Sequence, residues 1–217
     1  MGEFTEALRQ RVLDWLSVNV PESRLQHVVR VEEMAIALAQ HHQVDTTLAA
    51  QAALMHDLAK YFKPQRLLAM AKADGLAIDP VEELNPHLLH AEVGAIVARD
   101  EFGVDHPDVL AAIADHTLGR PGMSPISCIV FLADSLEPGR GDAPELITLR
   151  QASQESLPKA VWMSADCTLN HLISRQRLIH PRVLLTRNWF MREDTRTTQR
   201  RSPNRPSSPP IKQPRSA

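Results

Sequence analysis

Histidine and aspartate residues stand at separated positions of the chain where a metal site could be built. The strongest local signal is LMHDLAKYF, residues 54–62, in which His56 and Asp57 are adjacent and Lys60 follows. On a helix these two ligand types lie about 100° apart around the axis, so both can flank one ion. Lys60, three residues after Asp57, shares its face. An HD dipeptide alone does not establish a metal site, because a buried histidine beside a surface Asp–Lys pair is the commoner arrangement.

Further residues of the same chemistry come from other parts of the chain, each embedded among small or apolar neighbours. A polar side chain on an apolar helix face costs free energy unless it has a partner. Four imidazoles and two carboxylates suit iron, manganese or zinc rather than calcium. Six ligands exceed one tetrahedral site and match two ions that share a bridging carboxylate. The candidate metal ligands are His27, His56, Asp57, His90, His116 and Asp134.

The segments that carry these residues are expected to be helices. Apolar residues recur at helical spacing from about residue 5 to residue 191, and strand signals are scarce because aromatic residues make up only 4%. Helices are expected over residues 46–62 and, as the last of the set, over residues 158–179. The sequence therefore predicts an all-α fold, a helical bundle with the metal site between helices. The expected N-caps are Ser23, Asp45, Asp79, Asp105 and Ser124.

Composition indicates one folded domain followed by a different kind of segment. The chain has 217 residues, is 43% hydrophobic and has a formal net charge of -2, which argues against a general nucleic-acid binder. Residues 1–191 are the expected domain. Residues 192–217 are rich in Pro, Ser and Arg, and we expect a disordered basic tail. The tail is either a solvated extension or an arm that contacts RNA, an acidic partner or a membrane surface.

Cysteine usage and the lack of long apolar runs indicate a cytoplasmic protein. Cys128 and Cys167 form no CxxC pair, so a reducing compartment fits better than a disulfide framework. The N-terminus lacks the apolar core of a signal peptide, and no run approaches the roughly 20 apolar residues of a membrane span. We therefore expect no membrane partner.

The order of the candidate ligands resembles the two-metal form of the HD-domain superfamily of metal-dependent phosphohydrolases. Over about residues 5–190 the chain closely resembles the YqeK-type symmetrical bis(5′-nucleosyl)-tetraphosphatases. The resembling segments are RLQHVVRVEEMAIALA, ALMHDLAK, LLHAEVGA, ADHTLGRPGMSP, FLADSLEPGR and the late IHP…TRN. The resemblance implies an HD-domain helical bundle that splits diadenosine tetraphosphate symmetrically into two ADP. Two positions depart from the family pattern, Cys128 in place of lysine and Ser135 in place of a bulkier residue.

The resemblance also implies how the ligands are shared between two divalent ions. His27 and His56 would hold the first ion with Asp134, while His90 and His116 would hold the second, with Asp57 bridging both. Iron is the ion that the resemblance favours, with manganese, cobalt or zinc as alternatives. A hydroxide held between the two ions would attack the phosphoryl group in line.

Cationic and hydroxyl side chains near the ligands are candidate contacts for the phosphates. Lys60 is expected to stabilise developing charge, which makes it a catalytic candidate together with Asp57. Arginine forks fit phosphate oxygens, although a solvated loop charge is an equal alternative for Arg120. Glu137 is expected to orient a ligand or Arg140. The candidate substrate-binding residues are Arg24, Lys60, Thr117, Arg120 and Arg140.

Two other functions stay open at this point. The first is another HD phosphohydrolase activity, on a nucleotide, a cyclic dinucleotide or an alarmone. The second is a regulatory module that binds metal and nucleotide without turnover, and the intact set of six ligands argues against it. The expected partner is a small nucleotide, with no nucleic acid bound to the core. A homodimer and the contacts of the tail are left open.

Overall fold

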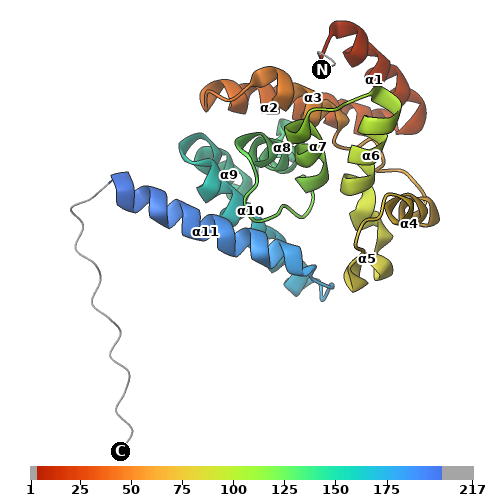
Figure 1. Ribbon diagram of the computed structural model, residues 1–217. Coiled ribbons are helices and arrows are strands. Elements are labelled where there is room, and N and C mark those ends of the chain that lie inside the picture. The colour runs from red at the N-terminus through yellow and green to blue at the C-terminus, as the bar shows by residue number, and fades with distance from the viewer. Residues whose placement is uncertain (1–3, 202–217) are drawn as a thin grey trace, which may run out of the picture.

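Helices joined by short loops make up residues 4–201, the part of the chain that the computed structural model describes (Figure 1). No strand occurs among residues 4–201, so the predicted all-α fold class is confirmed. In chain order the elements, including two 3-10 turns (η), are α1 Glu6–Asn19, α2 Glu22–His41, α3 Thr46–Met55, α4 Pro64–Ala73, α5 Pro80–Leu84, η1 Pro86–Leu89, α6 His90–Phe102, α7 Pro107–Asp115, α8 Pro125–Leu136, η2 Pro138–Arg140, α9 Pro144–Glu155, α10 Leu157–Ser174 and α11 Pro181–Arg201.

Two helices, α3 and α8, lie at the centre of the bundle. Every residue of α3 from Ala49 to Met55 is buried, and so is every residue of α8 from Ile126 to Ala133. A helix that is apolar on all sides must be covered on all sides, and α3 packs against α2, α7 and α8 while α8 also packs against α10. The C-terminal ends of these two central helices are therefore placed inside the molecule.

Most of the expected helix starts have the expected caps. Two are wrong. Helix α2 begins at Glu22, with Pro21 rather than Ser23 at the N-cap, since the proline already fixes the extended backbone before the first turn. Helix α7 is capped by His106, whose ring accepts from the backbone N–H of Asp108, because the N-cap is the residue directly before the N1 proline. The confirmed N-caps are Asp45, Asp79 and Ser124.

The helix expected over residues 46–62 is shorter than predicted and ends at Met55. His56 donates from Nδ1 to the carbonyl oxygen of Ala53 at 2.6 Å, the acceptor that the next α-helical N–H, that of Asp57, would otherwise use. Residues 56–62 continue in tight turns with hydrogen bonds between residues three apart, such as Lys60 N to Asp57 O at 3.0 Å. His56 and Asp57 consequently lie at a helix end and not along a helix face.

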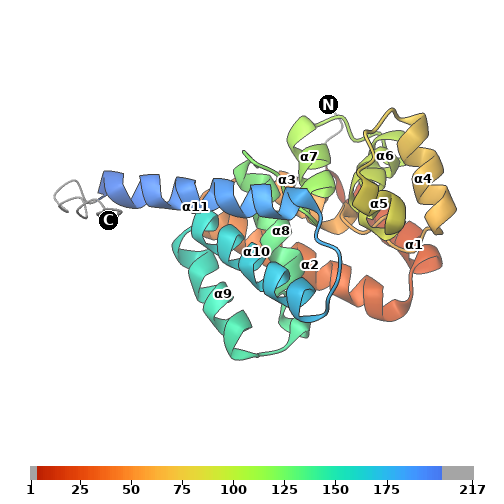
Figure 2. The same cartoon turned by 90° about the horizontal axis from the view of Figure 1, so that it is seen from below.

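The C-terminal boundary expected at residue 192 is also wrong, because α11 continues through Arg201. Helix α11 lies along α10, and its last turns extend beyond it (Figure 2). Phe190 of α11 is buried against the core, and Asp194 accepts hydrogen bonds from Trp162 and Ser156 on the α10 side. These tertiary contacts stabilise helix past residue 192. Residues 202–217 lie outside the described residues, so the disordered tail stays a prediction there.

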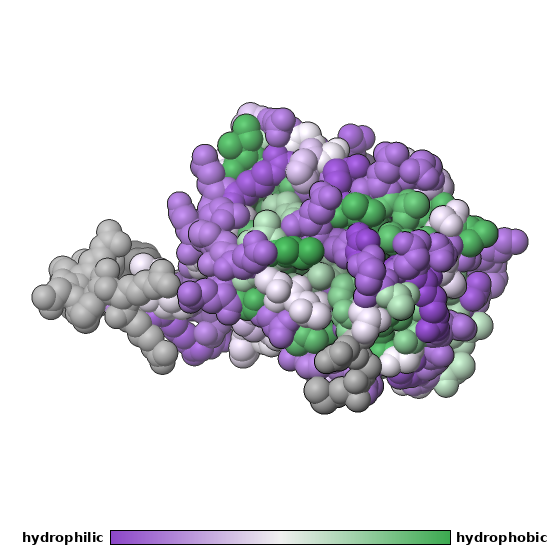
Figure 3. All heavy atoms as spheres, turned by 90° about the horizontal axis from the view of Figure 1, so that it is seen from above, coloured by the Kyte–Doolittle hydropathy of each residue, from purple (hydrophilic) through white to green (hydrophobic). Residues whose placement is uncertain are grey.

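Polar residues dominate one face of the molecule. On the face shown in Figure 3, hydrophilic residues cover most of the area and apolar residues form separate patches. Among the described residues, no helix combines the length and the apolar character that crossing a membrane requires.

Candidate metal centre

All six predicted metal ligands come together where several helices end or begin. His27 comes from the first half of α2 and Asp134 from the end of α8, and their Nε2 and Oδ1 atoms are 3.0 Å apart. His56 and Asp57 follow α3, and His56 Nε2 lies 3.9 Å from Asp134 Oδ1. Ligand atoms of His27, His56 and Asp134 all lie within 4.8 Å of one another, which is the spacing of a shared ion.

The remaining histidines meet Asp57 from the other side. His90 is the first residue of α6 and His116 follows the last residue of α7, and their Nε2 atoms are 3.1 Å apart. Asp57 Oδ1 lies 3.6 Å from Nε2 of His90 and 3.7 Å from Nε2 of His116, while Oδ2 faces His56 Nε2 at 3.4 Å. Asp57 therefore lies between two groups of ligands, one on each side of its carboxylate.

Three of the imidazoles are oriented by the same kind of local hydrogen bond. His56, His90 and His116 each occupy the position directly after a helical segment, and each donates from Nδ1 to the carbonyl oxygen three residues earlier. These bonds fix the proton on Nδ1 and leave the Nε2 lone pair pointing at the centre. The sequence analysis missed this hydrogen bond, whose only signal in the sequence is a histidine at the end of an apolar helical run.

His27 is oriented by a carboxylate instead. Its Nδ1 donates to Glu137 Oε1 at 2.9 Å, and Glu137 Oε2 accepts from Arg30 at 2.5 Å and from the backbone N–H of Gly139 at 2.6 Å. Burial would raise the pKa of Glu137, but hydrogen bonds from Arg30, His27 and Gly139 lower it to about 2. The carboxylate is thus charged at neutral pH and contacts His27, one of the two roles expected for it.

Arg30 was missed by the sequence analysis. It lies three residues after His27 on α2, on the same face, and this spacing is the signal that could have found it. Gly139 makes room for it, since a Cβ there would lie 2.5 Å from Arg30 Nη2. The arginine holds Glu137 in place and so supports the orientation of His27.

Three of the candidate ligand atoms are buried and have no hydrogen-bond partner. His56 is fully buried and Asp57 is 1% exposed. Nε2 of His27, Nε2 of His56 and Oδ1 of Asp57 are buried without a hydrogen-bond partner. Buried acceptors that lack a donor cost free energy, and a cation among them removes that cost. Imidazole nitrogen and carboxylate oxygen are also the donor set that divalent transition metals take, so the residues present fit a metal ion.

The protonation states of the second group suit metal binding as well. Burial, together with the neighbouring His116 and Lys60 charges, lowers the pKa of His90 to about 3, and burial beside His56 lowers the pKa of His116 to about 4. Burial would raise the pKa of Asp57, but His56, Lys60 and His116 hold it well below its usual range. Neutral imidazoles and a charged carboxylate are the forms that bind metal.

His56 behaves differently from these two histidines. Burial lowers its pKa, but the carboxylates of Asp57 and Asp134 outweigh burial and leave the pKa above its usual value. A metal ion that enters the first group therefore competes with a proton on His56.

Four of the five predicted substrate contacts lie against the ligands. Arg24 Nη1 is 3.0 Å from Asp57 Oδ2, and Arg140 Nη2 is 2.7 Å from Asp134 Oδ1. Lys60 Nζ is 3.0 Å from His90 Nε2. Thr117 Oγ1 lies 3.1 Å from Nε2 of His90 and 3.0 Å from Nε2 of His116. The four contacts are Arg24, Lys60, Thr117 and Arg140.

Arg120 and the two departures from the family pattern have other partners. The Arg120 guanidinium pairs with Asp115 at 3.1 Å. Cys128 is buried on α8 and donates to the backbone of Met123, and Ser135 donates to the carbonyl oxygen of Phe131. The contact described for each of these side chains is thus with a residue outside the set of metal ligands.

Comparison with known proteins places this centre in a family. The HD domain matches residues 24–139, the segment that carries all six candidate ligands. Two relatives named symmetrical bis(5′-nucleosyl)-tetraphosphatase, from Halalkalibacterium halodurans and Bacillus subtilis, are each 34% identical to the chain. The alignments cover 85% and 84% of this chain, and 98% and 97% of the relatives.

A solved structure agrees with these matches. It is described as a predicted HD superfamily hydrolase involved in NAD metabolism from Clostridium acetobutylicum, with 34% identity and a TM-score of 0.81. The similarity covers 85% of this chain and 97% of that chain. The chain therefore belongs to the HD domain family, and within it to the group of relatives named symmetrical bis(5′-nucleosyl)-tetraphosphatases.

Proposed function

We propose that this protein is a metal-dependent hydrolase that cleaves diadenosine tetraphosphate, or a related dinucleoside polyphosphate, symmetrically into two nucleoside diphosphates. The names of its full-length relatives support the reaction. The observation that carries the proposal is the convergence of four Nε2 atoms and two carboxylates on one centre, where Nε2 of His27, Nε2 of His56 and Oδ1 of Asp57 are buried without a hydrogen-bond partner. Such a centre suits phosphoryl transfer, in which positioning and charge neutralisation supply most of the catalysis.

Two divalent ions are proposed, divided by Asp57. His27, His56, Asp57 and Asp134 would hold the first ion, and His90 and His116 would hold the second with Asp57 as the bridge. When bound, such ions supply a nucleophile at neutral pH and neutralise charge on the phosphoryl oxygens. Iron is proposed from the family resemblance, and manganese, cobalt and zinc are alternatives for the same ligand set.

Cationic side chains stand at the exposed edge of the buried centre and would meet the phosphates. The Lys60 and Arg140 side chains are 34% and 39% exposed, whereas that of Asp57 is 1% exposed. Arg24 and Arg140 pair with Asp57 and Asp134, the carboxylates that would hold metal ions. Their guanidinium groups carry further N–H donors that would pair with phosphate oxygens.

Symmetrical cleavage sets where these groups must act. Water attacks the second phosphorus from one adenosine, the bond from that phosphorus to the oxygen joining it to the third breaks, and the opposite ADP leaves. Lys60, which lies beside His90, would stabilise the charge that develops on the leaving oxygen. Asp57 and Lys60 are therefore the proposed catalytic residues. Thr117 is a proposed substrate contact at the same edge.

Product analysis tests the reaction. Purified protein of known metal content is incubated with diadenosine tetraphosphate, with and without a chelator, and the nucleotides are separated. ADP alone is the expected product, lost on chelation and restored by Fe²⁺, Mn²⁺ or Co²⁺. AMP together with ATP, or no turnover by protein that holds two ions, would contradict the proposal.

The same assay separates the alternatives. Nucleoside triphosphates, cyclic dinucleotides and alarmones are offered in parallel at equal concentration, and faster turnover of one of them identifies another HD phosphohydrolase activity. Tight binding of metal and nucleotide without turnover of any substrate identifies a regulatory module. We expect the protein to act in the cytoplasm, and the same preparation tests for a homodimer by its mass in solution.

A further inference from the structure

Helix α11 contacts the backbone segment that follows His116. Thr186 is fully buried, and its hydroxyl lies between Leu118 O at 3.1 Å and the carbonyl oxygen of Arg182, within its own helix, at 2.8 Å. Leu118 is only two residues after His116. The next residue, Gly119, has φ +61, and a Cβ there would lie 2.6 Å from Thr186 Cγ2. The turn after His116 therefore packs against Thr186. Glycine is needed at position 119 because the backbone has a positive φ and because a Cβ would clash with Thr186.

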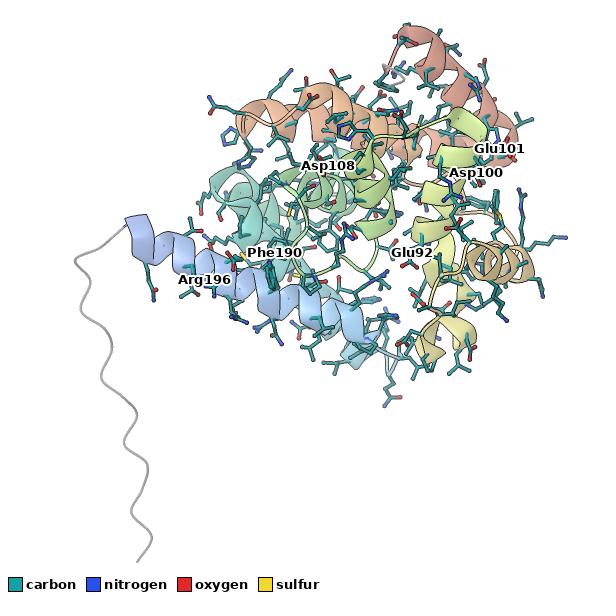
Figure 4. The ribbon with its side chains drawn as sticks, in the orientation of Figure 1. Glu92, Asp100, Glu101, Asp108, Phe190 and Arg196 are labelled. Atoms are coloured by element: carbon teal, nitrogen blue, oxygen red, sulfur yellow. The ribbon has the colours of Figure 1, made fainter. Side chains whose placement is uncertain are left out.

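The same helix contacts the segment that follows His90. Arg182 Nη1 donates to Glu92 Oε1 at 2.7 Å, and Glu92 lies on α6 two residues after His90 (Figure 4). Arg182 is thus bonded to the segment that carries His90, while Thr186, one turn later on α11, is bonded to the segment that carries His116.

The start of α11 is itself fixed against a third neighbour of the centre. The backbone N–H of Arg182 donates to His180 Nδ1 at 3.1 Å, which caps the helix. His180 is buried, and its Nε2 lies 3.4 Å from Glu82 Oε1 on α5. Helix α5 leads through η1 directly into His90. Three residues from the late IHP…TRN motif therefore reach the segments around the second group of ligands.

The second group of ligands is assembled from separate helices and needs support from outside them. His90 begins α6 and His116 follows α7, so no single helix sets the 3.1 Å between their Nε2 atoms. Helix α11 spans both segments and lies beyond residues 24–139, the part that matches the HD domain. We propose that Arg182 and Thr186 are positioning residues that set the spacing of His90 and His116 and thereby the affinity for the second metal ion.

The proposal rests on the two-ion centre of the proposed function but not on the identity of the substrate. Its test is therefore metal binding without nucleotide. Metal-free full-length protein is titrated with Mn²⁺, and the two binding steps are followed by calorimetry and by the electron paramagnetic resonance of free Mn²⁺. Thr186→Val keeps the shape and removes the hydroxyl, while Thr186→Ser keeps the hydroxyl. Arg187→Gln is the matched control, because it breaks an α11 ion pair with Asp166 on α10 at 2.8 Å.

We expect Thr186→Val to lower the affinity for the second Mn²⁺ by about 10- to 100-fold and to leave the affinity for the first unchanged. A loss of this size is usual when a residue that supports a metal ligand is removed. Thr186→Ser should restore the second affinity to within about 3-fold of wild type, and Arg187→Gln should bind both ions like wild type. If Thr186→Val does not fold, Arg182→Met decides by the same criterion, since it removes the bond to Glu92.

Each contrary outcome points to a different error. The positioning role alone is overturned if Thr186→Val and Arg182→Met bind both Mn²⁺ ions with wild-type affinity, or if they bind both ions equally more weakly. If Arg187→Gln also weakens binding of the second Mn²⁺, loosening α11 at any point has the same effect, and the specific positioning role is overturned. Wild-type protein that binds a single Mn²⁺ overturns the two-ion centre and this inference together.

Discussion

The Nε2 atoms of His90 and His116 lie 3.1 Å apart, and neither ring has a proton on that nitrogen to give to the other. Each ring already donates from Nδ1 to a backbone carbonyl, and burial holds the pKa of both imidazoles at about 3 and about 4, so both are neutral at physiological pH. Two lone pairs facing each other at this distance repel unless a cation lies near them. Lys60 and Thr117 are the donors that the structure places there.

Replacing Asp57 tests the bridge between the two groups of ligands. Asp57→Ala should lower both the metal content and hydrolysis of diadenosine tetraphosphate by more than about 100-fold, because even residues that merely support a metal ligand cost up to that much. The helix content, measured by circular dichroism, should stay largely unchanged. Asp100→Ala, an exposed aspartate paired with Arg99, is the control. Full turnover by Asp57→Ala would refute the two-ion mechanism.

Glu137 offers a separate test of the first group. Glu137→Gln removes the charge that holds Arg30 and His27, so the first metal ion should bind about 10- to 100-fold more weakly while the second is unaffected. Calorimetric titration of the metal-free protein measures both steps. Glu155→Gln, which alters an exposed pair with Lys159, should leave both unchanged. An unchanged first step in Glu137→Gln would show that the buried Glu137–His27 contact does not support metal binding.

The convergence of the candidate metal ligands could be predicted from the sequence because their chemistry conflicts with their surroundings. His27, His90 and Asp134 are polar residues in apolar helical runs, and such residues need a partner inside the fold. The order of the motifs then supplied a family. Their exact placement could not be predicted, because a side-chain bond such as that from His56 to Ala53 O ends a helix that apolar periodicity would extend.

Helix α11 and the direction of Arg120 escaped prediction for a different reason. Beyond residue 191 the sequence is polar, and the helix is stabilised by tertiary contacts such as that of Asp194 with Trp162, which no local pattern reports. A loop arginine can pair with several acids, and Arg120 pairs with Asp115, five residues earlier in the chain, rather than with the centre. Local sequence indicates that such a charge exists but does not indicate where it points.

The two arginines at and near the centre should differ in their effect on turnover. Arg140→Ala removes a guanidinium that lies 2.7 Å from Asp134 Oδ1, and we expect kcat/KM to fall by about 10- to 100-fold, the cost of one charge-assisted hydrogen bond. Arg120→Ala should change kcat/KM by less than about 3-fold, because that side chain is bonded to Asp115. Metal content is measured alongside both. A larger loss for Arg120→Ala than for Arg140→Ala would reverse the assignment of phosphate contacts.

The stability of the metal-free protein should fall as the pH falls from about 6.5 to about 5. In the folded protein the pKa values of His90 and His116 are about 3 and about 4, so both rings stay neutral over this range, whereas in the unfolded chain they take up protons near pH 6.5. The unfolded state therefore binds more protons, and acid favours unfolding. Each histidine should contribute about 1–2 kcal/mol to the loss.

Urea unfolding at pH 6.5 and pH 5 measures this loss, with His116→Gln as the comparison. The variant lacks one of the two depressed groups, so its stability should fall less over the same interval. His56 has a raised pKa, so its contribution to folding stability is fully present below about pH 6.5 and is lost only as the pH rises. The loss of stability between pH 6.5 and pH 5 is therefore assigned to His90 and His116. Stability that is equal at the two pH values, or a wild-type loss no larger than that of His116→Gln, would mean that these imidazoles are protonated in the fold and could not bind metal without first losing a proton.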